Sequence, residues 1–123
     1  MWSVGKPITT GQEYIESLRN RELSVYLFGE QIDDPVEHPI IRPSINALAA
    51  TYDLAQTNPD LAASVSPYTG EKINRFLHIA ENADDLILQN KMQRKLGQLT
   101  GTCFQRCVGM DAINSLHSVT YDM

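Results

Sequence analysis

Two cysteines, Cys103 and Cys107, are the residues best suited to chemistry in this chain, and the sequence has no others. On a helix, residues at i and i+4 lie on one face with their Cβ atoms roughly 5–6 Å apart. A disulfide needs Cβ atoms about 3.5–4.5 Å apart, so a helical pair is poorly placed for a direct bridge. An iron–sulfur cluster is larger, and each thiolate can bind a different corner of it.

A simpler interpretation of the pair is also open. Buried cysteines often act as small apolar residues, and this spacing alone is a weak metal signal. Arg106, next to Cys107, could stabilise a thiolate by its charge. Two cysteines cannot fill four coordination positions, so a cluster would need ligands from outside this chain, or His117 further along the same face. From the pattern alone, the apolar role is the commoner one.

The remaining polar candidates have more ordinary explanations. His38 lies in a proline-rich stretch, where a surface or turn histidine is expected, and His78 lies among apolar residues and is expected to be packed. The pairs Asp33–Asp34 and Asp84–Asp85 are adjacent in sequence, so their side chains diverge, and aspartates at a helix start usually cap it. The sequence contains no phosphate-binding glycine loop, nucleophile elbow or zinc spacing.

Composition narrows the class of protein. A chain of 123 residues and 13.8 kDa fits one domain, 1–123, and 42% apolar residues are enough for a core. The net charge of -5 and pI near 5.0 argue against a nucleic-acid or anionic-membrane partner. No apolar run approaches the roughly 20 residues of a membrane span, and no secretory signal is visible. We therefore expect a soluble cytoplasmic protein.

Local patterns predict a mainly α domain. Thr10 and Glu13 form a capping-box pattern at the start of a helix that should end near Asn20. Further elements are expected as a short strand at Val25–Phe28, a loop at Gln31–Pro43, a helix from Pro43 to Asn58, a short turn at Pro59–Ser64 and an extended segment at Lys72–Ile79.

The C-terminal third is expected to form two helices. The predicted helices are Ala83–Leu96 and Cys103–Tyr121, packed as an antiparallel pair, with a break bracketed by Gly97 and Gly101. Both sides of the last helix carry apolar or semi-apolar residues, and such a helix needs protein on both sides. The chain is therefore expected to be a fragment or subunit of a larger enzyme.

Seven segments carry a resemblance to a known family, in order and at natural spacing from about Thr10 to Tyr121. They are Glu13–Arg19, Val25–Glu30, His38–Asn46, Thr51–Gln56, Ile73–Phe76, Lys91–Gln98 and Cys103–Ala112. The chain resembles the N-terminal part of the 4-hydroxybutyryl-CoA dehydratase branch of the 4-hydroxyphenylacetate 3-hydroxylase family.

The resemblance implies a fold, cofactors and partners. It implies the N-terminal helical domain of an acyl-CoA-dehydrogenase-like fold, in a homotetramer that binds FAD and an acyl-CoA. It also implies a 4Fe–4S cluster held by three cysteines and one histidine, of which two cysteines match Cys103 and Cys107. The other cluster ligands and the catalytic residues would lie outside this chain, so the chain alone is expected to be inactive.

The implied reaction is the dehydration of 4-hydroxybutyryl-CoA to crotonyl-CoA, with isomerisation of vinylacetyl-CoA. The C3 hydrogen is barely acidic, and general base catalysis supplies only about 10²–10⁴-fold. The resemblance therefore implies a ketyl-radical mechanism in which a flavin takes part. Two alternatives are a flavin-dependent aromatic hydroxylase whose cysteines are structural, and a truncated assembly module without catalysis.

Overall fold

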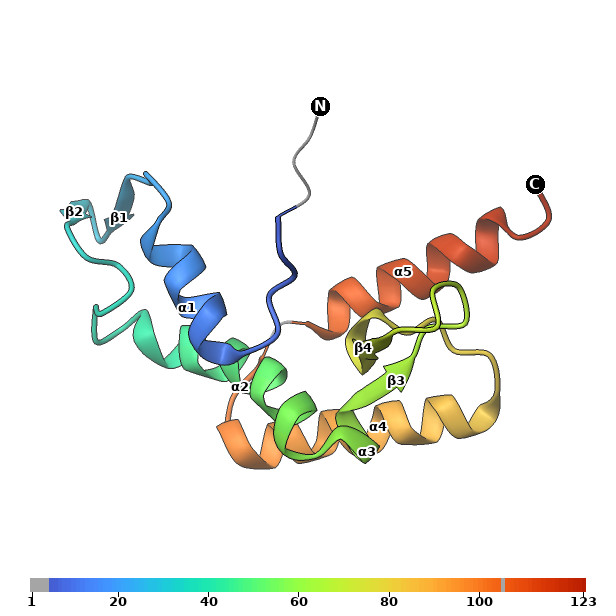
Figure 1. Cartoon of the computed structure of the whole chain (residues 1–123). Helices are drawn as coiled ribbons and strands as arrows, with labels where there is room; N and C mark the ends of the chain where they lie inside the picture. Colours follow the sequence, from blue (N-terminus) through green and yellow to red (C-terminus); the bar gives the residue numbers. More distant parts are fainter. Residues whose placement is uncertain (1–4, 105) are drawn as a thin grey trace.

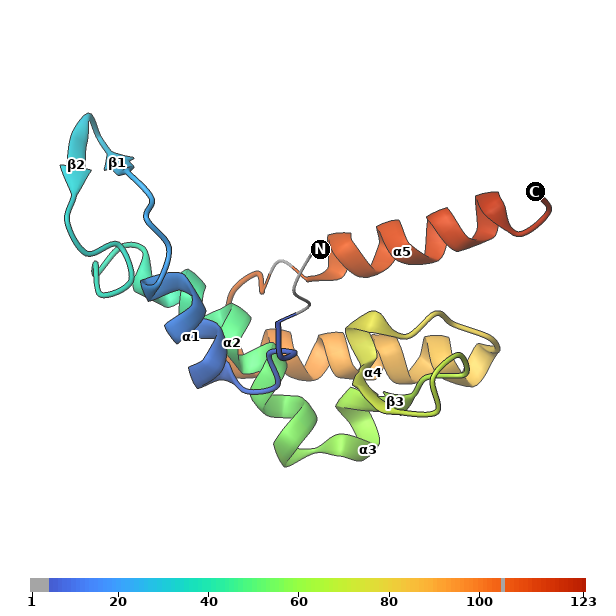
Figure 2. The same ribbon diagram turned by 45° about the horizontal axis from the view of Figure 1, so that its top comes forward.

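The computed structural model describes residues 5–104 and 106–123 and is mainly helical, as the sequence predicts (Figure 1). The elements are α1 (Gly11–Arg19), β1 (Val25–Leu27), β2 (Glu30–Ile32), α2 (Arg42–Thr57), α3 (Pro59–Ala62), β3 (Ala63–Val65), β4 (Lys72–Asn74), the 3-10 helix η1 (Arg75–Leu77), α4 (Ala83–Thr100) and α5 (Cys107–Thr120). Figures 1 and 2 place the β1–β2 hairpin at one end of the molecule and the end of α5 at the other.

Helix α1 begins as its capping pattern predicts. The Thr10 hydroxyl accepts from the Glu13 N–H at 3.1 Å, and the Glu13 carboxylate accepts from the Thr10 N–H. The Glu13 carboxylate also accepts hydrogen bonds from Thr9, and these bonds lower its pKa. The Gly11 N–H donates to the Asp53 carboxylate at 2.8 Å, which ties the start of α1 to α2.

Helix α2 also forms where it is predicted, with Pro43 in its first turn and its end at Asn58. A proline is tolerated there because the first N–H groups of a helix have no partner within it. Helices α1 and α2 pack against each other through a small apolar cluster of buried residues: Ile15, Val36, Ile45 and Ala49.

The predicted strand near residue 25 is confirmed, but the loop assigned from Gln31 onward was wrong at its start. Strand β1 pairs with a second strand, β2, to form an antiparallel hairpin. The turn between them places Phe28 at φ +52° and Gly29 at φ +85°. Positive φ at two successive turn residues is typical of a tight hairpin, whose usual sequence is Asn-Gly. Because Phe28 stands where asparagine is usual, the sequence did not show the pattern typical of this turn.

The extended segment expected at Lys72–Ile79 is confirmed only at its start. Strand β4 pairs with β3, and the chain then turns into η1. The Asn74 side chain accepts from the Phe76 N–H at 3.1 Å, which caps this short helix. The turn directs the Phe76 ring into the core, and Phe76 is only 2% exposed.

The C-terminal third departs from the prediction in two places. Helix α4 continues through Gly97 and ends at Gly101, which adopts φ +63°, so only the second glycine breaks the helix. Helix α5 begins at Cys107 and not at Cys103. The two helices run in opposite directions, as expected (Figure 1), but α5 packs more extensively on η1 than on α4.

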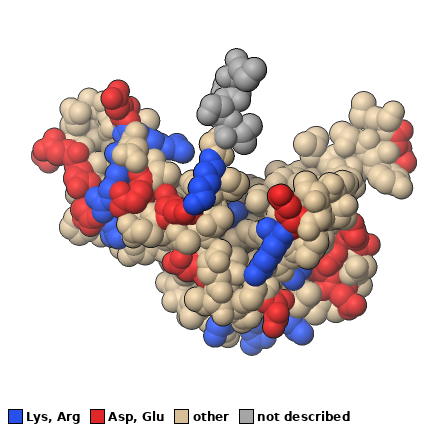
Figure 3. Space-filling model, viewed as in Figure 1, with Lys and Arg blue, Asp and Glu red and all other residues tan. Residues whose placement is uncertain are grey.

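One apolar core joins the C-terminal helices to α2, α3 and η1. Its most deeply buried large side chains are Met92 and Leu96 of α4 and Met110 of α5. No helix within residues 5–104 and 106–123 is both long enough and apolar enough to cross a membrane. Acidic and basic side chains are interspersed over the face shown in Figure 3.

Candidate functional site

The two cysteines lie on either side of the start of α5 and do not share a helical face. Cys103 precedes the helix and is exposed, whereas Cys107 is the first helical residue and is half-buried against the main core. Both are free thiols. The prediction that both thiols belong to consecutive turns of one helix was therefore wrong.

The reason lies in the side chain between them that must reach the core. Phe104 is 8% exposed, and its ring centroid lies 5.8 Å from that of Phe76. Gly101 ends α4 in a left-handed conformation, and the chain then runs without regular structure through Phe104. Burial of this ring outweighs the helix-forming preference of the segment, so α5 starts four residues later than predicted.

Arg106 has a different environment from the one its sequence position suggested. Its guanidinium carbon lies 4.5 Å from the centroid of the Tyr52 ring and 5.0 Å from that of Phe76. Its Nη1 donates to the Thr51 hydroxyl at 3.1 Å. Burial lowers the pKa of this guanidinium below its ordinary value. The guanidinium is therefore held half-buried against α2 and η1, and none of its hydrogen bonds among the described residues goes to a thiol.

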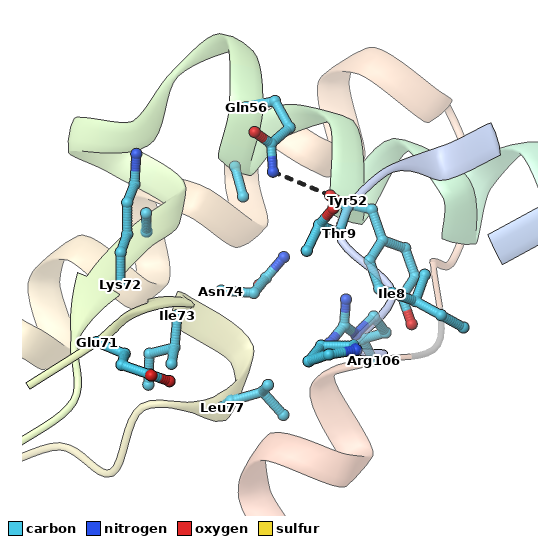
Figure 4. Close-up of a pocket in the computed structure, with 13 residues that line it drawn as sticks. Ile8, Thr9, Tyr52, Gln56, Glu71, Lys72, Ile73, Asn74, Leu77 and Arg106 are labelled. Atoms are coloured by element: carbon cyan, nitrogen blue, oxygen red, sulfur yellow. Dashed lines mark hydrogen bonds between the residues drawn. The ribbon is translucent and has the colours of Figure 1, made fainter. Parts of the chain in front are cut away.

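A pocket of about 290 Å³ lies beside Arg106 (Figure 4). It is bounded by the segment before α1, by α2, by β4 and by η1. Two side-chain amides order its walls: Gln56 Nε2 donates to the Thr9 carbonyl at 3.0 Å, and Asn74 Nδ2 donates to the Thr51 carbonyl at 2.9 Å. Sequence reasoning missed this pocket, because its walls come from five separate stretches of the chain with no common spacing: 7–9, 52–56, 63, 71–77 and 106.

Two other polar residues are buried for structural reasons. Arg75 donates to the carbonyls of Leu61 and Ala63, each at 2.7 Å, and so joins η1 to the end of α3. His78 is packed, as expected, and its Nε2 lies 3.0 Å from the Asp85 carboxylate. Burial opposes ionisation of Asp85, but hydrogen bonds from the Glu81 N–H and from His78 lower its pKa below the ordinary value.

The remaining histidines do not join the cysteines. His38 is partly exposed, and its ring accepts from the Ile40 N–H at 3.3 Å. His117 lies beside two tyrosine rings, with centroids 6.4 Å from Tyr68 and 6.2 Å from Tyr121. Within the described ranges, no three His, Cys, Asp or Glu side chains converge to hold a metal ion. Among these residues His117 is therefore not grouped with the two cysteines.

The fold and sequence define the class of protein. The family model described as 4-hydroxyphenylacetate 3-hydroxylase N terminal matches residues 10–123. The chain therefore belongs to this family.

Within the family, similarity is greater to dehydratases than to oxygenases. The chain is 52% identical over 118 residues to 4-hydroxybutyryl-CoA dehydratase/vinylacetyl-CoA-Δ-isomerase of Clostridium aminobutyricum. It is 69% identical, with a TM-score of 0.89, to the solved archaeal 4-hydroxybutyryl-CoA dehydratase of N. maritimus. These matches cover 94% of this chain but only 24% and 23% of the two relatives.

The oxygenase branch is more distant. The oxygenase component of 4-hydroxyphenylacetate 3-monooxygenase from Geobacillus sp. is 30% identical and covers 76% of this chain and 19% of its own length. A solved oxygenase component complexed with FAD is 27% identical, with a TM-score of 0.60, over 72% of this chain and 19% of that one.

Proposed function

We propose that this chain forms the N-terminal part of an enzyme that dehydrates 4-hydroxybutyryl-CoA to crotonyl-CoA and isomerises vinylacetyl-CoA. The observation that carries the proposal is the 69% identity and TM-score of 0.89 to a solved 4-hydroxybutyryl-CoA dehydratase across 94% of the chain. Identity to the two oxygenase components described above is 30% and 27%, over shorter spans. The complete enzyme would have an acyl-CoA-dehydrogenase-like fold, of which this chain is one domain.

FAD is the organic cofactor that we propose for the complete enzyme. A relative of the same family, similar in fold at a TM-score of 0.60, has been solved with FAD bound. The chain spans less than a quarter of that relative's length, so most flavin contacts would come from segments outside residues 1–123.

Cys103 and Cys107 are proposed as two ligands of a 4Fe–4S cluster. Both thiols are free, and one is exposed, which suits soft ligands that meet iron from outside the domain. Cys107 is the first residue of α5, so its side chain lies at the start of the helix, half-buried at the edge of the core. Such a cluster, when bound with an open iron position, supplies a Lewis acid for the leaving hydroxyl group.

The residues that flank the cysteines would hold them in place. Phe104 is anchored in the core against Phe76, and Arg106 is held by the Tyr52 ring and the Thr51 hydroxyl. Ligands supported by packed neighbours keep their geometry better than ligands on a free loop. Packing of these two side chains would therefore restrict the backbone next to each thiol.

One face of α5 is proposed to contact the rest of the enzyme. Val108, Leu116 and Val119 are 72%, 65% and 73% exposed. An exposed apolar stripe of this kind is typical of a contact surface. The further partners proposed are the acyl-CoA substrate and other subunits of a homotetramer, in the cytoplasm.

The experiment that tests the proposed function uses the full-length protein under anaerobic conditions. We expect conversion of 4-hydroxybutyryl-CoA to crotonyl-CoA, followed by thioester analysis. A parallel assay supplies 4-hydroxyphenylacetate, reduced flavin and dioxygen, and we expect no hydroxylated product. Hydroxylation without dehydration would place the protein in the oxygenase branch and contradict the proposal.

A further inference from the structure

Arg106 has hydrogen-bond donors without an acceptor in the described part of the chain. A guanidinium offers five N–H groups, and one hydrogen bond from this guanidinium is found there, from Nη1 to the Thr51 hydroxyl. No carboxylate lies within 4.0 Å of Arg106 among the residues described, whereas Arg19 and Arg42 both pair with Glu37. Arg106 is half-buried, so the N–H groups that it does not use within the protein are available to a ligand.

Arg106 is one of the residues that line the 290 Å³ pocket (Figure 4). The Tyr52 and Phe76 rings hold it at 4.5 and 5.0 Å, so its fork is fixed before any ligand arrives. Lys72 adds a second cation to the lining, and Glu71 beside it adds a carboxylate. Ile8, Ile73 and Leu77 give much of the remaining wall an apolar character.

We infer that this pocket binds a phosphate ester through Arg106, with the apolar walls contacting the organic part of the ligand. A planar guanidinium fork matches the oxygens of a phosphate group and can bind two of them at once. The pocket, at about 290 Å³, also has more room than one carboxylate side chain would fill, because a water molecule takes up only about 30 Å³ in liquid water.

The inference rests on the proposed function for the source of the phosphate. An acyl-CoA and FAD both carry phosphate groups joined to an organic chain, so either can supply the ligand. Their shared chemistry is a phosphate ester, and separate binding measurements distinguish the two sources.

The test compares two identical substitutions in the full-length enzyme. Arg106→Gln removes the charge and the fork and leaves a polar amide that ends two bonds short of the Nη1 atom that donates to Thr51. Arg94→Gln makes the same change at an exposed residue of α4 and is the control. The measurements are the Kd for FAD of the flavin-free protein, and kcat and KM for 4-hydroxybutyryl-CoA and for the phosphate-free 4-hydroxybutyryl-pantetheine.

We expect Arg106→Gln to weaken binding of one phosphate carrier by about tenfold to hundredfold, the usual effect of losing a charged hydrogen bond. A raised KM for the CoA thioester with an unchanged KM for the pantetheine thioester identifies CoA, and a raised Kd for FAD identifies the flavin. Values for both carriers within threefold of those of Arg94→Gln would overturn the inference, and so would equal losses with both thioesters at an unchanged Kd for FAD.

A second measurement needs no variant and covers the case in which Arg106→Gln does not fold. Wild-type protein is treated with phenylglyoxal, and modification of Arg106 and Arg94 is quantified by peptide mass spectrometry. Saturating CoA or FAD should slow modification of Arg106 and leave Arg94 unchanged. Equal modification of Arg106 with and without both ligands would overturn the inference. This readout does not depend on turnover, so it remains decisive if the proposed dehydratase activity is absent.

Discussion

Replacing Gly11 by alanine tests the contact that fixes α1 against α2. A Cβ atom at this position would lie 2.5 Å from Oδ2 of Asp53 and 2.9 Å from the carbonyl oxygen of Ala49. The Gly11 N–H also donates to Asp53 Oδ1 at 2.8 Å. The Asp53 carboxylate can rotate away from a new methyl group. The Ala49 carbonyl belongs to the backbone of α2, so it can move only if the two helices separate.

The expected cost has two parts. Over-packing costs about 1–3 kcal/mol, and loss of a hydrogen bond to a charged group costs about 1.5–3 kcal/mol. Because the two effects share one contact, we expect Gly11→Ala to lower the free energy of unfolding by about 2–4 kcal/mol. The matched control is Gly97→Ala within α4, where a Cβ meets nothing within 4 Å. That variant should be more stable by about 0.5–1 kcal/mol, because alanine is a better helix former.

The assay is urea denaturation of the chain, followed by far-UV circular dichroism. Asp53→Ala and the double variant with Gly11→Ala complete a mutant cycle. The double variant should lose less stability than the sum of the single losses, by at least about 0.5 kcal/mol, because the removed carboxylate can no longer collide or bond. Additive losses, or a Gly11→Ala variant as stable as Gly97→Ala, would refute the proposed contact.

Three further outcomes are expected in the same denaturation assay. Phe104→Ala should lower the free energy of unfolding by about 3–5 kcal/mol, because the Phe104 ring is buried. Phe28 is 89% exposed, so Phe28→Ala should change it by less than about 1 kcal/mol, and equal effects of the two variants would contradict the burial of Phe104. Thr10→Ala should cost about 0.5–2 kcal/mol through loss of the cap, and no loss would count against the capping box. The pKa of Asp85 is lowered on folding, so its ionised form stabilises the fold above about pH 4, and this stabilisation is lost as the pH falls through the lowered pKa. Asp85→Asn should therefore make the free energy of unfolding less dependent on pH in the acid range.

The elements that depend on local signals could be predicted from the sequence. The Thr10 capping box and the Pro43 first turn act within one helical turn, and both mark helix starts in the structure. Gly101, one of the two glycines that bracket the predicted break, ends α4 in a left-handed conformation, although the helix was predicted to end earlier, at Leu96. Each of these signals depends only on residues that are close together in the sequence.

The features that depend on tertiary contacts could not be predicted. The start of α5 is set by burial of Phe104 against Phe76, a residue 28 positions earlier in the numbering. The position of Arg106 is set by Tyr52 and Thr51 of α2, at still greater separation. No periodicity encodes these pairings, so the sequence indicated the two cysteines as candidate ligands but not the pocket beside them.

The most direct test of the proposed cluster site is iron and acid-labile sulfide per protomer in the anaerobic full-length enzyme. Cys103→Ala and Cys107→Ala are compared with Leu99→Ala, a change at an exposed residue of α4. We expect both cysteine variants to lose the cluster and the dehydratase activity while keeping most of their fold, and Leu99→Ala to keep full iron. If the cysteines were only packed apolar residues, their removal would cost roughly 1–3 kcal/mol of stability and leave iron unchanged. Full iron in both cysteine variants would contradict the assignment of the cluster to Cys103 and Cys107.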